Sequence, residues 1–130
     1  MTATITPPQG EAFAPAGEWA AELTELQARR HHAQAMGGPE ALARFKASGR
    51  MNARERIAAL LDPGSFHEMG TLAGKGHYHA DGSYAHTEPT NAIVGTGRID
   101  GRKLALHVDD FTIRAGSSEG TIADKWIYIE

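Results

Sequence analysis

The chain of 130 residues contains no cysteine. This absence excludes disulfide bonds, thiol nucleophiles and zinc sites with thiolate ligands. It is typical of proteins in a reducing compartment, so we expect a cytoplasmic location. The first 17 residues also lack the basic start and the apolar centre of a secretory signal peptide.

Long apolar runs and a strong net charge are missing as well. The longest apolar run, Ile57 to Leu61, is too short to span a bilayer. The formal net charge is −3, so the protein has no overall basic field for nucleic acid or an anionic membrane. We therefore expect neither as a partner. With 41% hydrophobic and 22% charged residues, the composition is that of a globular protein of at most one domain.

The first half of the chain has the pattern of short helices. Residues 1–17 are rich in Thr, Pro, Ala and Gly, which predicts a disordered lead-in. A helix is predicted over 18–35, where Trp19, Leu23 and Leu26 recur on one apolar stripe. Gly37-Gly38 ends it, and a second helix is predicted from Pro39 through about Ala47.

A third helix has a strong start signal. Asn52 can cap it, and Glu55 can return the hydrogen bond in a capping box. Asp62-Pro63-Gly64 is typical of the turn that would end this helix. Residues 66–69 are predicted to form a short strand, and residues 70–90 a loop rich in Gly, His and Tyr with weak periodicity.

The clearest strands follow. One is predicted over 91–99 and another over 103–108, joined by Asp100-Gly101, a strong signal for a type I′ hairpin turn. Leu104, Leu106 and Val108 alternate towards a core, whereas Lys103 and His107 point away from it.

The end of the chain predicts a Gly/Ser loop over 116–120 and then a helix. Ser117 or Ser118 can cap this helix, and Ile122, Trp126 and Ile129 lie on one stripe. Backbone N–H groups at such a helix start can hold a phosphate or a thioester oxygen. Arg114 and Lys125 are cationic neighbours in sequence. A tight strand-to-helix turn without a ligand is the structural alternative.

Other motifs point to weaker alternatives. Gly95-Thr96-Gly97 precedes a strand rather than a helix, so it is interpreted as glycines that ease strand packing, not as a dinucleotide loop. A metal could be held by the loop side chains His77, His79, His86, Asp81 and Glu88, but their spacing fixes no geometry, and we expect solvent-exposed histidines and no metal site.

Two further patterns could carry side-chain catalysis. Residues 116–120 spell G-x-S-x-G, the nucleophile-elbow motif with Ser118 as nucleophile, yet no histidine follows His107 to act as its base. Asp109 and Asp110 are adjacent at a strand end, where neighbouring side chains point to opposite faces. We expect one of them to cap the loop and the other to be solvated.

Three segments in order resemble one family. They are ARERIAALLDPGSF over 53–66, GTGRIDGR over 95–102 and DDFTIRAGSSEG over 109–120. Together with the leading helix they resemble the N-terminal part of the carboxyltransferase (beta-type) chains of biotin-dependent acyl-CoA carboxylases, such as propionyl-CoA and methylcrotonyl-CoA carboxylases. The resemblance covers about residues 19–130. Where the family commonly has two glycines before the serine, this chain has Ala115-Gly116.

The resemblance implies an α/β fold: a partial crotonase-like ββα unit preceded by short N-terminal helices, with residues 18–130 truncated in the first ββα helix. It implies transfer of a carboxyl group from carboxybiotin, carried on an alpha-type subunit, to the α-carbon of an acyl-CoA, in an oligomer of transferase chains. No catalytic residue is assigned. The coenzyme A surface would include Arg114, Gly116, Ser117, Ser118 and Gly120.

Because the family's Gly-Gly oxyanion motif and biotin-binding half lie further along, we expect this piece to be inactive alone. Two alternatives stay open at this point. The chain could be a non-catalytic module that binds partner subunits through the Trp19, Leu23 and Leu26 stripe. It could also be a fragment of a serine hydrolase that uses Ser118.

Overall fold

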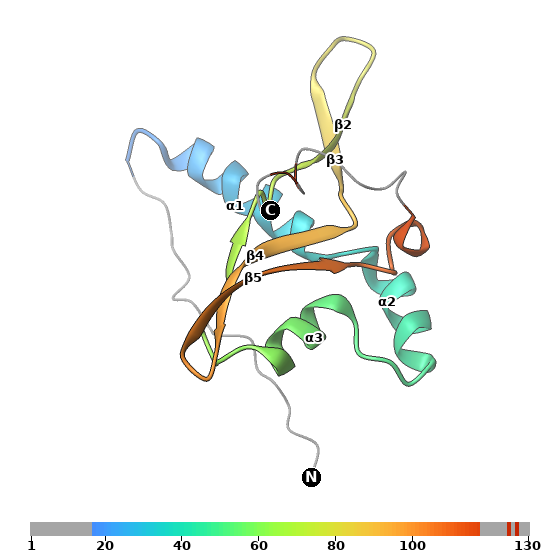
Figure 1. Ribbon diagram of the computed structural model, residues 1–130. Coiled ribbons are helices and arrows are strands. Elements are labelled where there is room, and N and C mark those ends of the chain that lie inside the picture. Colours follow the sequence, from blue (N-terminus) through green and yellow to red (C-terminus); the bar gives the residue numbers. More distant parts are fainter. Residues whose placement is uncertain (1–16, 118–124, 126, 128–130) are drawn as a thin grey trace.

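The computed structural model describes residues 17–117, 125 and 127. Three helices precede five strands and a short 3₁₀ turn (Figure 1). The elements are α1 (Ala20–Gln34), α2 (Gly38–Ala47), α3 (Ala53–Leu60), β1 (His67–Met69), β2 (Gly74–Tyr78), β3 (Tyr84–Pro89), β4 (Ala92–Ile99), β5 (Arg102–Asp109) and η1 (Arg114–Gly116). No helix within this described part is long and apolar enough to cross a membrane.

Strands β1, β4 and β5 form an antiparallel sheet with β4 in the middle. The turn between β4 and β5 has φ of 49° at Asp100 and 77° at Gly101, as a type I′ turn requires. The predicted hairpin and its turn are therefore confirmed. Residues 92–95 of β4 are buried in succession, so this strand is covered on both faces rather than one.

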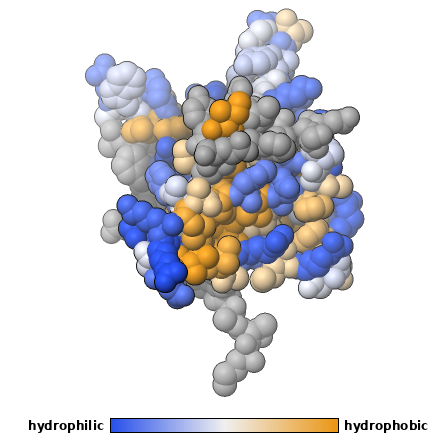
Figure 2. Space-filling view, in the orientation of Figure 1, coloured by the Kyte–Doolittle hydropathy of each residue, from blue (hydrophilic) through white to orange (hydrophobic). Residues whose placement is uncertain are grey.

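The core lies between α3 and the β4–β5 hairpin. Ile57 in α3 and Leu61 just after it are buried together with Ile93 of β4 and Leu106 of β5. Figure 1 shows α3 running beneath the hairpin, and Figure 2 shows apolar side chains gathered in this region. The predicted alternation along β5 is confirmed: Leu106 is buried, its apolar neighbours on the same face are half-buried, and Lys103 and His107 are exposed.

Helix α3 begins as its sequence predicts. The Asn52 side chain accepts a hydrogen bond from the Glu55 backbone at 2.9 Å, and the Glu55 carboxylate accepts one from the Asn52 backbone at 2.9 Å. Lys46 lies 2.7 Å from Glu55, and this contact together with the Asn52 backbone bond lowers the pKa of the Glu55 carboxyl. The capping box is thus joined to the end of α2.

The turn that ends α3 also supports the hairpin. The Asp62 carboxylate accepts hydrogen bonds from the backbone N–H groups of Asp100 at 2.9 Å and Gly101 at 2.8 Å. The backbone N–H of Asp62 donates to the carbonyl of Arg98 at 2.8 Å. Asp62 therefore fixes the end of α3 against the tip of the β4–β5 hairpin, although Asp62 and Asp100 are 38 positions apart in the sequence.

The glycines of β4 allow close packing. A Cβ atom at Gly95 would overlap the His67 carbonyl oxygen of β1, and one at Gly97 would overlap the Leu61 side chain. Because this space is already filled, any larger residue there would push the core apart. The prediction that these glycines serve strand packing is confirmed.

The prediction of a loop over 70–90 is wrong. Residues 74–78 and 84–89 form the β2–β3 hairpin, which projects from the rest of the molecule (Figure 1). At its turn, the Asp81 carboxylate accepts hydrogen bonds from the backbone and hydroxyl of Ser83. Its strands are half-buried or exposed throughout, so no alternation of apolar and polar residues marked them in the sequence.

The bounds predicted for the first helix are nearly correct, but the apolar stripe predicted on it does not pack into the hydrophobic core. Helix α1 has no buried residue, and Trp19, which precedes it, is 66% exposed. The helix instead contacts β3: the Arg29 guanidinium lies 4.0 Å from the centre of the Tyr84 ring, in a cation–π contact.

Replacing Asn52 by alanine should lower the free energy of unfolding by about 1 kcal/mol, because α3 loses its side-chain cap. The measurement is urea unfolding followed by circular dichroism at 222 nm. Gln27→Ala, at an exposed position of α1, is the control and should change the value by less than about 0.5 kcal/mol. Equal stability of the Asn52→Ala variant and the parent chain would show that the capping box contributes nothing.

Candidate functional site

The segment after β5 turns sharply, and Asp110 starts the turn. This residue is 1% exposed, and its Oδ1 accepts hydrogen bonds from the Thr112 backbone at 2.9 Å and the Thr112 hydroxyl at 2.7 Å. Asp109 points the other way, is exposed, and lies 3.2 Å from the His107 ring. The two carboxylates do not converge, which confirms that one caps the loop while the other faces solvent.

Asn91 fixes the far end of the same loop. It is fully buried, its side-chain amide donates to the Ser117 carbonyl at 2.7 Å, and its own carbonyl accepts from the Asp110 backbone at 2.6 Å. The Thr112 hydroxyl accepts from the backbone of Gly37, between α1 and α2, at 2.9 Å. Residues 110–117 are therefore attached to the residue before β4 and to the connection between α1 and α2.

Asn91 is a positioning residue that the sequence motifs do not single out. The signal was present, since an amide side chain stands next to the apolar run 92–94 of a buried strand. A buried amide must be hydrogen-bonded, so such a residue has a partner somewhere in the fold. The sequence does not say that the partner is the carbonyl of Ser117.

Three successive residues of the loop adopt left-handed backbone conformations. The φ angles are 46° at Arg114, 52° at Ala115 and 75° at Gly116. Glycine adopts such angles readily, whereas each residue with a Cβ is destabilised there by about 1 kcal/mol or more. Non-glycine residues held in this way concentrate at functional sites, because the surrounding contacts must enforce the conformation.

Three of the five residues predicted to contact coenzyme A lie within the described part of the chain. Arg114, Gly116 and Ser117 lie together in this loop. Ser118 and Gly120, with the predicted helix bearing Ile122, Trp126 and Ile129, are outside the described residues. This part of the anion-site prediction therefore stays a prediction.

Lys125, expected as a cationic neighbour, faces the interior. It is 6% exposed, and its methylene groups lie against Gly70. Burial lowers the pKa of Lys125, and the nearby Arg54 acts in the same direction while Glu68 opposes it. Because Arg54 and Glu68 already form a two-bond ion pair at 2.8 and 3.2 Å, Lys125 joins an internal charge cluster, not an exposed anion site.

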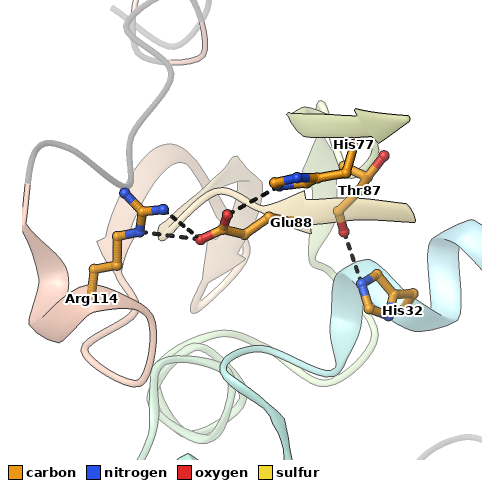
Figure 3. A network of polar contacts seen from close by, with 5 residues as sticks. All are labelled: His32, His77, Thr87, Glu88 and Arg114. Carbon is orange, nitrogen blue, oxygen red and sulfur yellow. Dashed lines mark hydrogen bonds and ion pairs between the residues drawn. The ribbon is translucent and has the colours of Figure 1, made fainter. Parts of the chain in front are cut away.

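Arg114 is paired with the β2–β3 hairpin (Figure 3). Its Nη2 and Nε lie 2.9 and 3.1 Å from Oε1 of Glu88, and this contact lowers the pKa of the Glu88 carboxyl. The Nε2 atom of His77 lies 3.4 Å from the other oxygen, Oε2. His32, at the end of α1, is bound to the Thr87 carbonyl at 2.8 Å.

These side chains surround an open groove of about 630 Å³ between the end of α1, the start of α2, the β2–β3 hairpin and the loop after β5. Its lining includes His32, Met36, Pro39, His77, His86, Glu88, Thr112 and Arg114. The rings of His77 and His86 are stacked, with centres 4.6 Å apart. Within the described ranges, no three His, Asp or Glu side chains are grouped so that they could hold a metal ion.

Comparison with known proteins defines the class. Residues 44–130 match the carboxyl transferase domain family, so the chain belongs to that family. Over 110 residues the chain is 32% identical to the propionyl-CoA carboxylase beta chain of Saccharopolyspora erythraea. This alignment covers 85% of the chain and 20% of that protein. Over 104 residues the chain is 38% identical to the mitochondrial propionyl-CoA carboxylase beta chain of Rattus norvegicus. That alignment covers 77% of the chain and 19% of the relative.

The fold agrees with this membership. A crystal structure of transcarboxylase 12S, described as a hexamer with methylmalonyl-coenzyme A and methylmalonic acid bound, matches with a TM-score of 0.65 and 29% identity. The match covers 80% of this chain and 20% of that one. The family resemblance and the partial crotonase-like α/β fold are confirmed. The chain spans about one fifth of the length of these relatives.

Replacing Ala115 by glycine should raise the free energy of unfolding by about 0.5–1 kcal/mol, because glycine removes the left-handed strain. Urea unfolding is again the measurement. Ala58→Gly, on an exposed face of α3, is the matched control and should lower stability by about 1 kcal/mol. A destabilised Ala115→Gly variant would contradict the left-handed loop.

Proposed function

We propose that this chain is the N-terminal part of a carboxyltransferase that moves a carboxyl group from carboxybiotin to the α-carbon of an acyl-CoA. Membership of the carboxyl transferase domain family supports the reaction class. The beta-chain relatives and the coenzyme A thioester bound to transcarboxylase 12S support the substrate class.

The observation that carries the proposal is the loop after β5. Asn91 and Asp110 hold it from both ends, and its residues 114–117 combine one cation with little side-chain bulk. A ligand can therefore approach the backbone closely. We propose Arg114, Gly116, Ser117, Ser118 and Gly120 as the part of the coenzyme A surface that this chain supplies.

This arrangement suits carboxyl transfer chemically. When the α-proton of the acyl group leaves, negative charge develops on the thioester oxygen. Fixed backbone N–H groups stabilise such an oxygen without any reactive side chain. The reaction therefore needs no serine nucleophile, and Ser118 would act through its backbone.

The partners follow from the same family. We propose that biotin is carried by a separate alpha-type subunit and that the transferase chains form an oligomer, as in the hexameric transcarboxylase 12S. Because this chain corresponds to one fifth of such a protein, we propose that it is inactive alone. By the resemblance, the oxyanion and biotin-binding parts lie in the remainder.

The test is an assay of the polypeptide that continues this sequence to the length of its relatives, together with a biotin-carrying subunit. Incorporation of labelled bicarbonate into propionyl-CoA, dependent on ATP and biotin, is expected, and the 130-residue chain should give none. Absence of transfer by the longer chain with several short acyl-CoA substrates would refute the proposed reaction.

In the same assay, Ser118→Ala should keep at least about half of the parent kcat, because only the backbone of this residue takes part. Arg114→Gln should raise KM for the acyl-CoA about tenfold with little change in kcat, because a charge-assisted bond to phosphate is lost. A drop in kcat of a hundredfold or more for Ser118→Ala would favour a serine nucleophile instead.

A further inference from the structure

Side chains with nitrogen atoms outnumber acidic ones in the lining of the groove beside Arg114. Three imidazoles and a guanidinium line it, and Glu88 is the one acidic side chain among its described lining residues. That carboxylate does not point away into solvent. It lies on the guanidinium of Arg114, the cation proposed above to meet a phosphate group (Figure 3).

The Arg114–Glu88 ion pair is one in which an anion of higher charge can displace the carboxylate of Glu88. Both contacts of Arg114 go to a single oxygen of Glu88, and the two side chains remain 43% and 34% exposed. Exposed pairs of this type contribute little to stability. A phosphate carries more charge than a carboxylate and offers three acceptor oxygens, which match the two-pronged guanidinium geometry.

We propose that Glu88 is a specificity-determining residue: it occupies Arg114 while the groove is empty, and a phosphate group of the ligand displaces it. The inference rests on the proposed function, which supplies coenzyme A as the phosphate-bearing ligand. A ligand with a single carboxylate gains little from this exchange, since it only replaces one carboxylate by another. The exchange therefore favours ligands that carry phosphate.

The structure also provides a place for the displaced carboxylate. The buried Nε2 atom of His77 already lies 3.4 Å from Oε2 of Glu88. Lys75 lies opposite Glu88 in the β2–β3 ladder, and His86 is stacked against His77. A small rotation of Glu88 towards these groups would leave it partnered after Arg114 is released.

The experiment is calorimetric titration of the 130-residue chain with coenzyme A and, separately, with inorganic pyrophosphate. Glu88→Gln keeps the shape of the side chain but removes its charge, and should bind both probes about two- to fivefold tighter than the parent chain. Glu22→Gln, an exposed position on α1 with the same change in net charge, should leave both affinities within about 1.5-fold.

Arg114→Gln should weaken binding of both probes, and adding Glu88→Gln to it should give no further gain, because the pair acts as a unit. As a second measurement, pyrophosphate should shift the Nε–H nuclear magnetic resonance signal of Arg114 in the folded parent chain. Assignment of that signal comes from its loss in Arg114→Gln.

Equal or weaker binding by Glu88→Gln, no detectable binding by either chain, or an equal gain in Glu22→Gln would each overturn the inference. So would an undiminished gain from Glu88→Gln in the Arg114→Gln background. These results are separable from failure of the proposed function. That failure would appear as no carboxyl transfer by the longer polypeptide, while tighter pyrophosphate binding by Glu88→Gln persisted.

Discussion

Two polar side chains withdrawn from water, Asn91 and Asp110, stand at the open end of the β4–β5 hairpin, and the geometry of the site depends on them. Buried amides and carboxylates must be hydrogen-bonded, because an unpaired group costs about 1–3 kcal/mol. Asn91 meets this requirement through Ser117, and one oxygen of Asp110 through Thr112. The loop between these partners is therefore held in a left-handed conformation that its own sequence does not favour.

This constraint connects packing with function. A loop fixed at both ends holds Arg114 and the neighbouring backbone in one geometry before a ligand arrives. Its amides at Gly116 and Ser117 already donate to the carbonyls of Ile113 and Arg114, so the loop is also tied internally. The described part of the chain shows no convergent pair of catalytic carboxylates at the strand end, since Asp109 and Asp110 diverge.

The β2–β3 hairpin lines the groove on the side that faces Arg114. It brings Glu88 and His77 to Arg114 from 26 and 37 residues earlier in the chain, and it packs against α1 through Tyr84. No residue of β2 or β3 is buried, so the position of this hairpin depends on ion pairs, ring stacking and single hydrogen bonds. Contacts of this type are weak individually and are open to competition from a charged ligand.

Local rules were enough to predict much of this protein. The capping box at Asn52, the type I′ turn at Asp100-Gly101 and the alternation along β5 are set by residues close in sequence, and three ordered segments indicated the family. The β2–β3 hairpin was not predicted because its strands are half-buried or exposed and show no alternation of apolar and polar residues. The Glu88–Arg114 pair, the inward turn of Lys125 and the part played by Asn91 depend on segments that meet only after folding. Only the tertiary structure could decide these, because burial and long-range pairing, not local propensity, determine which polar groups find one another.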